Sequence, residues 1–216
     1  MKEEKRKLIA ATYMPLAMLM IMYLAMWIQW TFDLRLYFLG VHPLKMDGII
    51  GIFTSVFIHG DWGHLAGNTL PFFIFTTALF YYYPKVAHKV FFGMWFVSGL
   101  YLWLFARGEA WHIGASGLVY AMATYHLISA ALQREIRLVS FSMLIIFLYG
   151  SMIWGFFPEF FPEQRISWQA HLTGAIVGVV FAFFFHHHAP KGKQYFEDED
   201  EDEEIDIDNP PYWMES

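Results

Sequence analysis

Long apolar runs separated by short polar connections dominate this chain. The first run covers residues 8–30 and follows a short, basic-rich stretch at 2–7. A helix of that length reaches about 34 Å, which is enough to cross a bilayer. The run is too long for the apolar part of a cleaved signal peptide, and no small-residue cleavage site follows, so we expect it to stay as an anchor. Five more runs lie at about 66–83, 89–105, 115–132, 138–157 and 170–187.

The six runs predict an all-α polytopic membrane protein, a bundle of six transmembrane helices. Pro15 and Pro71 lie inside or near the start of predicted helices, where a membrane protein tolerates them. The first loop, 31–65, is long and mixes Trp, Phe and Leu, so we expect it to lie on or in the membrane interface. The other connections are short: 83–88, 106–114, 133–137 and 158–169.

The distribution of Lys and Arg predicts the orientation of the bundle. Ten of these residues lie on the side that holds both chain ends, and four lie on the other side. Because cytoplasmic loops carry the excess of Lys and Arg, both termini are expected in the cytoplasm, in a bacterial cytoplasmic membrane. The ten are Lys2, Lys5, Arg6, Lys7, Lys85, Lys89, Arg134, Arg137, Lys191 and Lys193, and the four are Arg35, Lys45, Arg107 and Arg165.

Composition supports lipid as the solvent of one compact unit. The chain is 57% hydrophobic and only 16% charged, whereas a soluble domain carries about 25% charged residues. We therefore divide it into a cytoplasmic N-terminus at 1–7, a membrane domain at 8–188 and an acidic cytoplasmic tail at 189–216. The tail holds ten carboxylates between 197 and 208, a like-charged block that is typical of a disordered end.

Composition also excludes several kinds of chemistry. The chain has no cysteine, so disulfides, thiolate metal sites and cysteine nucleophiles are ruled out. Its few basic residues lie at the membrane edges, which argues against a nucleic-acid partner.

Polar residues inside membrane helices are costly, so they are candidates for function. They occur here in three clusters, at the starts of the second, fourth and sixth runs. All three of these runs pass from outside to inside, which places the clusters at similar depth below the outer surface. The clusters are His59, His64 and Asn68; Gly114, Ser116, Gly117 and Tyr120; and His171, Gly174 and Gly178.

Ser116 and His171 are the candidate catalytic pair. A serine hydroxyl is a poor nucleophile unless a base within hydrogen-bond reach takes its proton, and an imidazole titrates near neutrality. Gly174 and Gly178 form a small-xxx-small face that lets the sixth run approach a neighbour closely. No Asp or Glu inside these runs is available as a third member, so a Ser–His dyad is predicted.

Three other side chains support this reading. Tyr120 lies one helical turn after Ser116, on the same face, where its ring can pack on His171. His64 and Asn68 are also one turn apart and project together. With the backbone N–H of Ser116 they form a candidate oxyanion site, in which one donor typically contributes about 2.7–4 kcal/mol in the transition state.

Taken singly, each cluster has a plainer interpretation. Gly-Ala-Ser-Gly is more often helix packing than catalysis, and Leu118 breaks the Gly-x-Ser-x-Gly pattern of soluble hydrolases. A lone membrane histidine is as often structural as functional. The joint arrangement at one depth favours catalysis. The His tract at 186–188 ends the sixth run and is interpreted as an interfacial polar cap rather than a metal site.

The three clusters together resemble the rhomboid family of intramembrane serine proteases, and the likeness covers about residues 8–188. The resemblance implies Ser116 as nucleophile and His171 as general base, with an oxyanion site made by His64, Asn68 and the Ser116 amide. It implies a supporting role for His59 in water access or structure. It also implies cleavage of transmembrane segments of other proteins near the outer face, without metal or cofactor. The Trp-Arg pair often found in the first loop of the family is absent.

Two alternatives remain at this stage. A non-enzymatic relative would keep the fold and bind transmembrane helices, but it would have lost Ser116 or His171, and both are present. A metal-dependent membrane enzyme or transporter would use His59, His64 and His171. No His-Glu-x-x-His signature supports that second alternative.

Overall fold

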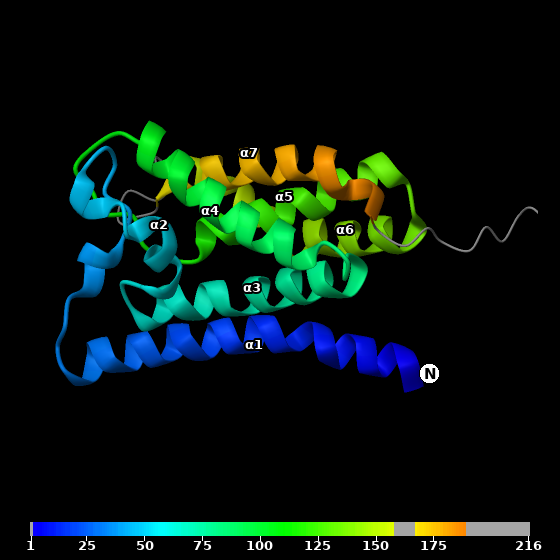
Figure 1. Ribbon diagram of the computed structural model, residues 1–216, viewed down its shortest axis with the longest axis horizontal. Coiled ribbons are helices and arrows are strands. Elements are labelled where there is room, and N and C mark those ends of the chain that lie inside the picture. Colours follow the sequence, from blue (N-terminus) through cyan, green and yellow to red (C-terminus); the bar gives the residue numbers. More distant parts are fainter. Residues whose placement is uncertain (1, 158–166, 189–216) are drawn as a thin grey trace, which may run out of the picture.

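The computed structural model describes residues 2–157 and 167–188; the acidic tail, Arg165, Lys191 and Lys193 lie outside this part. Six long helices lie side by side along one axis (Figure 1). They are α1 (Lys2–Thr31), α3 (Trp62–Tyr82), α4 (Ala87–Phe105), α5 (Ser116–Gln133), α6 (Ile136–Tyr149) and α7 (Trp168–Phe185). Short 3-10 helices extend α6 and α7: η4 (Gly150–Phe156) and η6 (His186–His188).

Each apolar run of the sequence corresponds to one of these helices, so the all-α bundle is confirmed. The helix α1 begins at Lys2 and therefore includes most of the stretch that was expected to precede the membrane domain. The described part contains no strand beyond an isolated β-bridge between Val41 and His112. Four short helical pieces occupy the first loop: η1 (Leu36–Leu39), η2 (Met46–Gly48), α2 (Gly51–Thr54) and η3 (Ser55–Phe57).

Three long helical stretches are both strongly apolar and largely exposed on the outside of the protein. By length and composition, three helical stretches of the described chain are apolar enough to cross a membrane: Lys2–Thr31, Ile136–Phe156 and Trp168–His188. No more than a third of the most apolar window of each is buried inside the protein. The central helix α5, in contrast, has more than half of its residues buried, among them the polar side chains of Tyr125, His126 and Ser129. Only side chains that face lipid have to be apolar, so a helix that is covered by other helices can carry polar side chains.

The centre of the bundle is α5, which packs against α3, α4, α6 and α7. Its inward side chains include Leu118, Met122 and Tyr125, none more than 2% exposed. On one side α1 lies along α3, as Figure 1 shows at the bottom of the view. The helix α6 has only three buried residues, Leu138, Ser142 and Ile145, and is the least enclosed of the six.

The closest helix pair is α5 and α7, and glycine makes this approach possible. A Cβ on Gly174 would lie 2.0 Å from the carbonyl oxygen of Gly117, and one on Gly178 would lie 2.1 Å from that of Ala121. At this contact Thr124 donates from its hydroxyl to the Ala175 carbonyl at 3.0 Å. The small-xxx-small face of the sixth run therefore packs against the fourth run, through Gly117.

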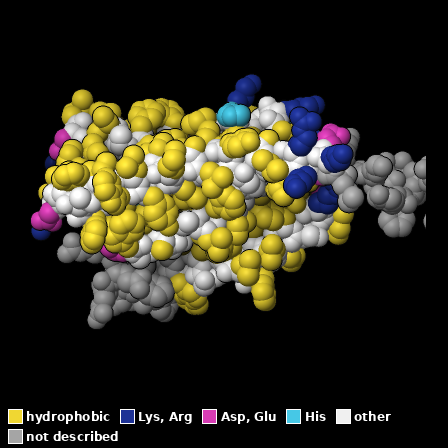
Figure 2. Space-filling view, turned by 90° about the horizontal axis from the view of Figure 1, so that it is seen from below, with side chains coloured by type: hydrophobic (Ala, Val, Ile, Leu, Met, Phe, Trp, Pro, Cys, Tyr) yellow, Lys and Arg dark blue, Asp and Glu magenta, His cyan; other side chains and the backbone are white. Residues whose placement is uncertain are grey.

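The surface of the bundle is apolar along its length and charged at its ends. Figure 2 shows hydrophobic side chains covering the middle of the visible face, with Lys and Arg gathered mostly at one end. That end holds the start of α1 and the end of α7 (Figure 1). Exposed apolar residues such as Phe147 (84% exposed) and Met20 (68% exposed) would be unfavourable in water. The chain is suited to lipid around its middle.

At the opposite end, two loops and the end of α4 are joined by hydrogen bonds. The Trp103 indole donates to the Lys45 carbonyl at 2.9 Å, and the Leu44 N–H donates to the Trp103 carbonyl at 3.0 Å. The bridge between Val41 and His112 then connects the first loop to the α4–α5 loop at 106–115. This end of the molecule contains the polar clusters of the sequence.

Replacing Gly178 tests the close approach of α5 and α7. Gly178→Ala is expected to lower the free energy of unfolding by about 1–3 kcal/mol, because its Cβ would overlap backbone that cannot easily move. Thermal unfolding in detergent measures the change. The matched control is Gly67→Ala on α3, whose Cβ would meet nothing within 4 Å. It should be neutral or slightly stabilising, and equal destabilisation by both variants would contradict the packing.

Candidate active site

The serine and histidine singled out in the sequence lie in hydrogen-bond contact. Ser116 is the first residue of α5, and His171 is in the first turn of α7 and 7% exposed. The Nε2 atom of His171 lies 2.9 Å from the Ser116 Oγ. The close packing of α5 on α7 begins directly after this contact, at Gly117 and Gly174, and it brings the two side chains within reach.

Two contacts fix the orientation of the His171 ring. Its Nδ1 atom lies 2.8 Å from the Gly155 carbonyl oxygen, and the Tyr120 ring stacks on it with centroids 4.1 Å apart and planes at 9°. A carbonyl oxygen can only accept, so Nδ1 carries the proton. The Nε2 lone pair then faces Ser116, whose hydroxyl donates to it. This is the tautomer in which an imidazole can act as general base.

Gly155 was missed by the sequence analysis. Its carbonyl takes the place that a carboxylate holds in a triad, and it comes from η4, just after α6. A Cβ at this position would lie 2.1 Å from the Tyr120 hydroxyl and 2.9 Å from His171 Nδ1, so only glycine fits. The Tyr120 hydroxyl donates to the carbonyl of Met152, also in η4. The only signal in the sequence is a glycine within an apolar run.

The loop that leads to Ser116 is held by backbone hydrogen bonds. Gly114 has a φ of +107°, which glycine adopts readily, and a Cβ there would lie 2.7 Å from the His64 ring. The Gly114 N–H donates to the Ser55 carbonyl at 2.9 Å. The next N–H, of Ala115, donates to Nε2 of His59 at 3.3 Å. His59 thus contacts the nucleophile loop through the backbone rather than through Ser116.

The predicted oxyanion residues lie on the first two turns of α3. Asp61 caps this helix by accepting from the His64 N–H at 2.7 Å, a favourable N-cap arrangement that positions the first turn. The His64 ring packs against Gly114 and lies 4.9 Å from the His59 ring. Asn68 is 7% exposed and donates one side-chain N–H to the His64 carbonyl at 3.0 Å. The Ser116 N–H is at a helix start, where backbone amides lack intrahelical acceptors.

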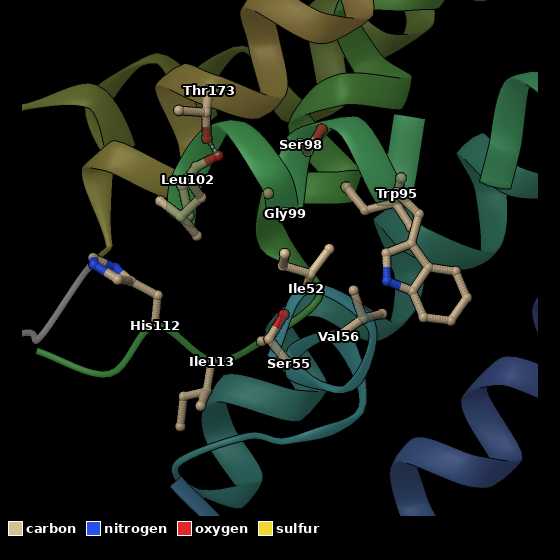
Figure 3. A pocket seen from close by; sticks show the side chains of 14 residues that line it. Ile52, Ser55, Val56, Trp95, Ser98, Gly99, Leu102, His112, Ile113 and Thr173 are labelled. Atoms are coloured by element: carbon tan, nitrogen blue, oxygen red, sulfur yellow. Dashed lines mark hydrogen bonds between the residues drawn. The ribbon is translucent and has the colours of Figure 1, made fainter. Parts of the chain in front are cut away.

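A small cavity of about 30 Å³ lies between α4, the start of α7 and the first loop (Figure 3), and its lining includes Gly114 and Gly117 but neither Ser116 nor His171. Three buried polar atoms of its lining have no hydrogen-bond partner within the described part of the chain: Trp95 Nε1, Ser98 Oγ and His112 Nε2. Unpaired polar groups are unfavourable in a dry interior, and this volume suffices for a water molecule. The cavity therefore has room for a water molecule and polar atoms that could bind it.

Histidines elsewhere in the bundle lie away from the Ser116–His171 pair. The tract at 186–188 follows α7, and Nδ1 of His186 lies 2.9 Å from the Ala182 carbonyl of that helix. His126 lies deeper in α5 and contacts the Phe75 carbonyl at 3.0 Å. Across residues 2–157 and 167–188, no group of three His, Asp or Glu side chains is arranged to hold a metal ion.

Two buried histidines, His59 and His112, lie outside the spanning helices, and their pKa values are strongly lowered. Burial is the main cause that lowers the pKa of His59 to about 3 and that of His112 to about 4. His64 lowers the pKa of His59 further, while Asp61 acts against the shift; His42 lowers the pKa of His112 further. Both imidazoles are therefore neutral at pH 7. A neutral ring is also what the hydrogen bond from the Ala115 N–H requires, because Nε2 of His59 must have a free lone pair to accept it.

Comparison with known proteins shows one family. The family model of the rhomboid domain matches residues 47–188. Uncharacterized proteins of Mycobacterium tuberculosis and Mycobacterium leprae are each 31% identical over 163 residues, 71% of this chain and 65% and 62% of theirs. A mimivirus protein named "putative rhomboid protein" is 25% identical over 150 residues, 67% of this chain and 79% of its own length. The chain thus spans about two thirds of the mycobacterial relatives.

Acid should destabilise the loop region through these histidines. A histidine whose pKa is lower in the folded than in the unfolded protein stabilises the fold at neutral pH. That contribution is lost as the pH falls from about 6.5 towards 4. Thermal unfolding in detergent between pH 7.5 and 4 should show a falling midpoint, and His112→Asn should make the fall less steep. Trp103→Phe, in the same region, should keep the parent slope. Identical slopes for all three proteins would contradict the assignment.

Proposed function

The chain belongs to the rhomboid family, and on that premise we propose that it is an intramembrane serine endopeptidase. Its substrates are transmembrane segments of other membrane proteins, which it cleaves near the outer face of the bilayer. The reaction uses a Ser116–His171 dyad and needs no metal or cofactor.

The observation that carries this proposal is the oriented Ser116–His171 pair. The 2.9 Å contact between the hydroxyl and the imidazole allows proton transfer, and the Gly155 carbonyl holds the tautomer that accepts the proton. A serine and a histidine that served only helix packing would not require this orientation. The alternative of a helix-binding relative without activity has no comparable support, since it predicts a broken dyad.

The mechanism follows from this geometry. Ser116 Oγ attacks the scissile carbonyl carbon as its proton passes to His171 Nε2, and the carbonyl oxygen becomes an oxyanion. The Ser116 N–H, Asn68 and His64 stabilise that charge. His171 then gives its proton to the leaving amine, which breaks the peptide bond and leaves an acyl-enzyme. Water, activated by His171, hydrolyses the ester and restores the hydroxyl.

The substrate must unwind before this attack. Backbone amides of a helix in lipid are hydrogen-bonded and shielded, so the scissile bond has to leave the helix and enter a hydrated site. The least enclosed helix, α6, gives a substrate lateral access from the lipid. The loops at the dyad end, including the first loop, then control the access of water.

The proposed orientation sets the side of cleavage. Ser116 and His171 are at the starts of α5 and α7, and these helix starts lie at the end of the bundle opposite the start of α1 and the cluster of Lys and Arg. With both termini in the cytoplasm, this end faces outward. Cleavage would thus release the outer part of a substrate from its membrane anchor.

Removing the nucleophile tests the proposal. Ser116→Ala is expected to lower cleavage of a single-span model substrate by about 10³-fold or more, with the thermal unfolding midpoint preserved. A fluorescent fluorophosphonate should label the parent protein at Ser116, mapped by peptide mass spectrometry, and should not label the variant. His171→Ala should lose both signals as well.

The matched control is Ser140→Ala, which removes an exposed hydroxyl on α6. It should keep full cleavage and labelling. Undiminished cleavage by Ser116→Ala would rule out this nucleophile, and a parent protein that neither cleaves nor labels would support the inactive relative.

A further inference from the structure

His112 has no role in the dyad, yet it connects three segments around it. Its backbone pairs with Val41 of the first loop, through N–H to carbonyl bonds of 2.8 and 2.9 Å. Its ring Nδ1 lies 2.6 Å from the Ser167 Oγ. Figure 3 shows the ring directed towards the start of α7. His112 precedes Ser116 by four residues, and Ser167 precedes His171 by four.

Ser167 gives up an ordinary role to make this contact. It is the N-cap residue of α7, and a serine there usually accepts from a backbone N–H in the first turn. Its side chain makes no such cap. Its carbonyl accepts from the His171 N–H at 3.2 Å, while its hydroxyl contacts His112. The serine thus belongs both to the helix that carries the base and to the contact with the nucleophile loop.

A second contact joins the same two segments. With its amide oriented so that both groups are satisfied, the Gln169 side chain donates to the Arg107 carbonyl at 3.2 Å and accepts from the Arg107 N–H at 3.1 Å. Arg107 lies at the beginning of the α4–α5 loop and His112 near its end. The loop is therefore held to the first turn of α7 at two points.

The need for these contacts follows from how the dyad is built. Ser116 starts α5 and is preceded by an irregular loop with positive φ at Gly108 and Gly114. Packing of α5 on α7 begins only after Ser116, so helix contacts alone do not fix the loop. A displacement of about 1 Å at reacting groups costs as much as 100-fold in rate.

We propose that His112 is a positioning residue of the dyad. Its hydrogen bond to Ser167 holds the loop that ends in Ser116 against the helix that carries His171, and so keeps the hydroxyl within proton-transfer distance of Nε2. This inference rests on the proposed protease function. It assigns His112 no contact with the substrate and no proton of the reaction.

A double-mutant cycle tests this role in the full-length protein. His112→Leu and Ser167→Ala should each lower kcat by about 10- to 100-fold with KM changed less than twofold. The double variant should be no slower than either single variant, because both remove the same contact. His112→Asn, whose side-chain amide can also bond to a hydroxyl, should recover much of the lost kcat. The rate of fluorophosphonate labelling at Ser116 should follow kcat in all four variants.

The matched control is Trp103→Phe, which removes another hydrogen bond between outer segments, the one to the Lys45 carbonyl. It should lower the unfolding midpoint as much as His112→Leu does while leaving kcat and labelling at the parent level. Additive losses in the cycle, no recovery in His112→Asn, or an equal loss of kcat in Trp103→Phe would overturn the proposal.

Failure of the protease function itself gives a different pattern. In that case the parent protein neither cleaves the substrate nor reacts with the fluorophosphonate. The double-mutant cycle of His112→Leu and Ser167→Ala is then repeated with the thermal unfolding midpoint as the measured quantity. Coupled effects of His112→Leu and Ser167→Ala would support the contact between loop and helix, whereas additive effects would overturn it.

Discussion

The approach of α7 to α5 is the constraint on which the rest of the structure depends. Gly174 and Gly178 leave no space between these helices for a side-chain carbon, and the backbone of Gly117 and Ala121 fills that space. Ser116 and His171 lie next to this contact in their helices, so the packing brings the two side chains near one another, with Oγ and Nε2 2.9 Å apart. Apolar helices in lipid are not driven together by the hydrophobic effect. Their association depends on close van der Waals contact and on hydrogen bonds such as the one from Thr124 to Ala175.

The site places polar groups where their cost in the membrane is offset by hydrogen bonds. His171 is bonded on both nitrogens, to Ser116 and to Gly155. The bond from Ala115 to His59 stabilises the loop before the nucleophile. Within the described part of the chain, buried polar atoms without a partner occur in the lining of the small cavity and also at Nδ1 of His59. The hydrogen bonds of His171 and Ala115 hold the side chains and the backbone around Ser116 and His171 in fixed positions.

The bundle also divides its helices by environment. The stretches that qualify as spans by composition, α1, α6 with η4, and α7, are those that expose most of their apolar windows. The polar clusters lie at the starts of α3, α5 and α7, where side chains such as Asn68 and His171 are buried among neighbouring helices. A membrane helix can carry such groups only when other helices shield them from lipid, so the arrangement of the bundle and the location of the site have the same physical cause.

The sequence by itself determined the number and extent of the long helices, because lipid demands continuous apolar runs whose length can be counted. It also determined that the motifs around Asn68, Ser116 and His171 share one depth, since alternate crossings run in the same direction. The contacts made by Gly155 and by Ser167 with His112 were decided only by the tertiary structure. The hydrogen bond of a backbone carbonyl does not depend on residue type, so no sequence pattern predicts it. Irregular loops have no repeating pattern of apolar residues, so the contacts that they make depend on how the helices pack.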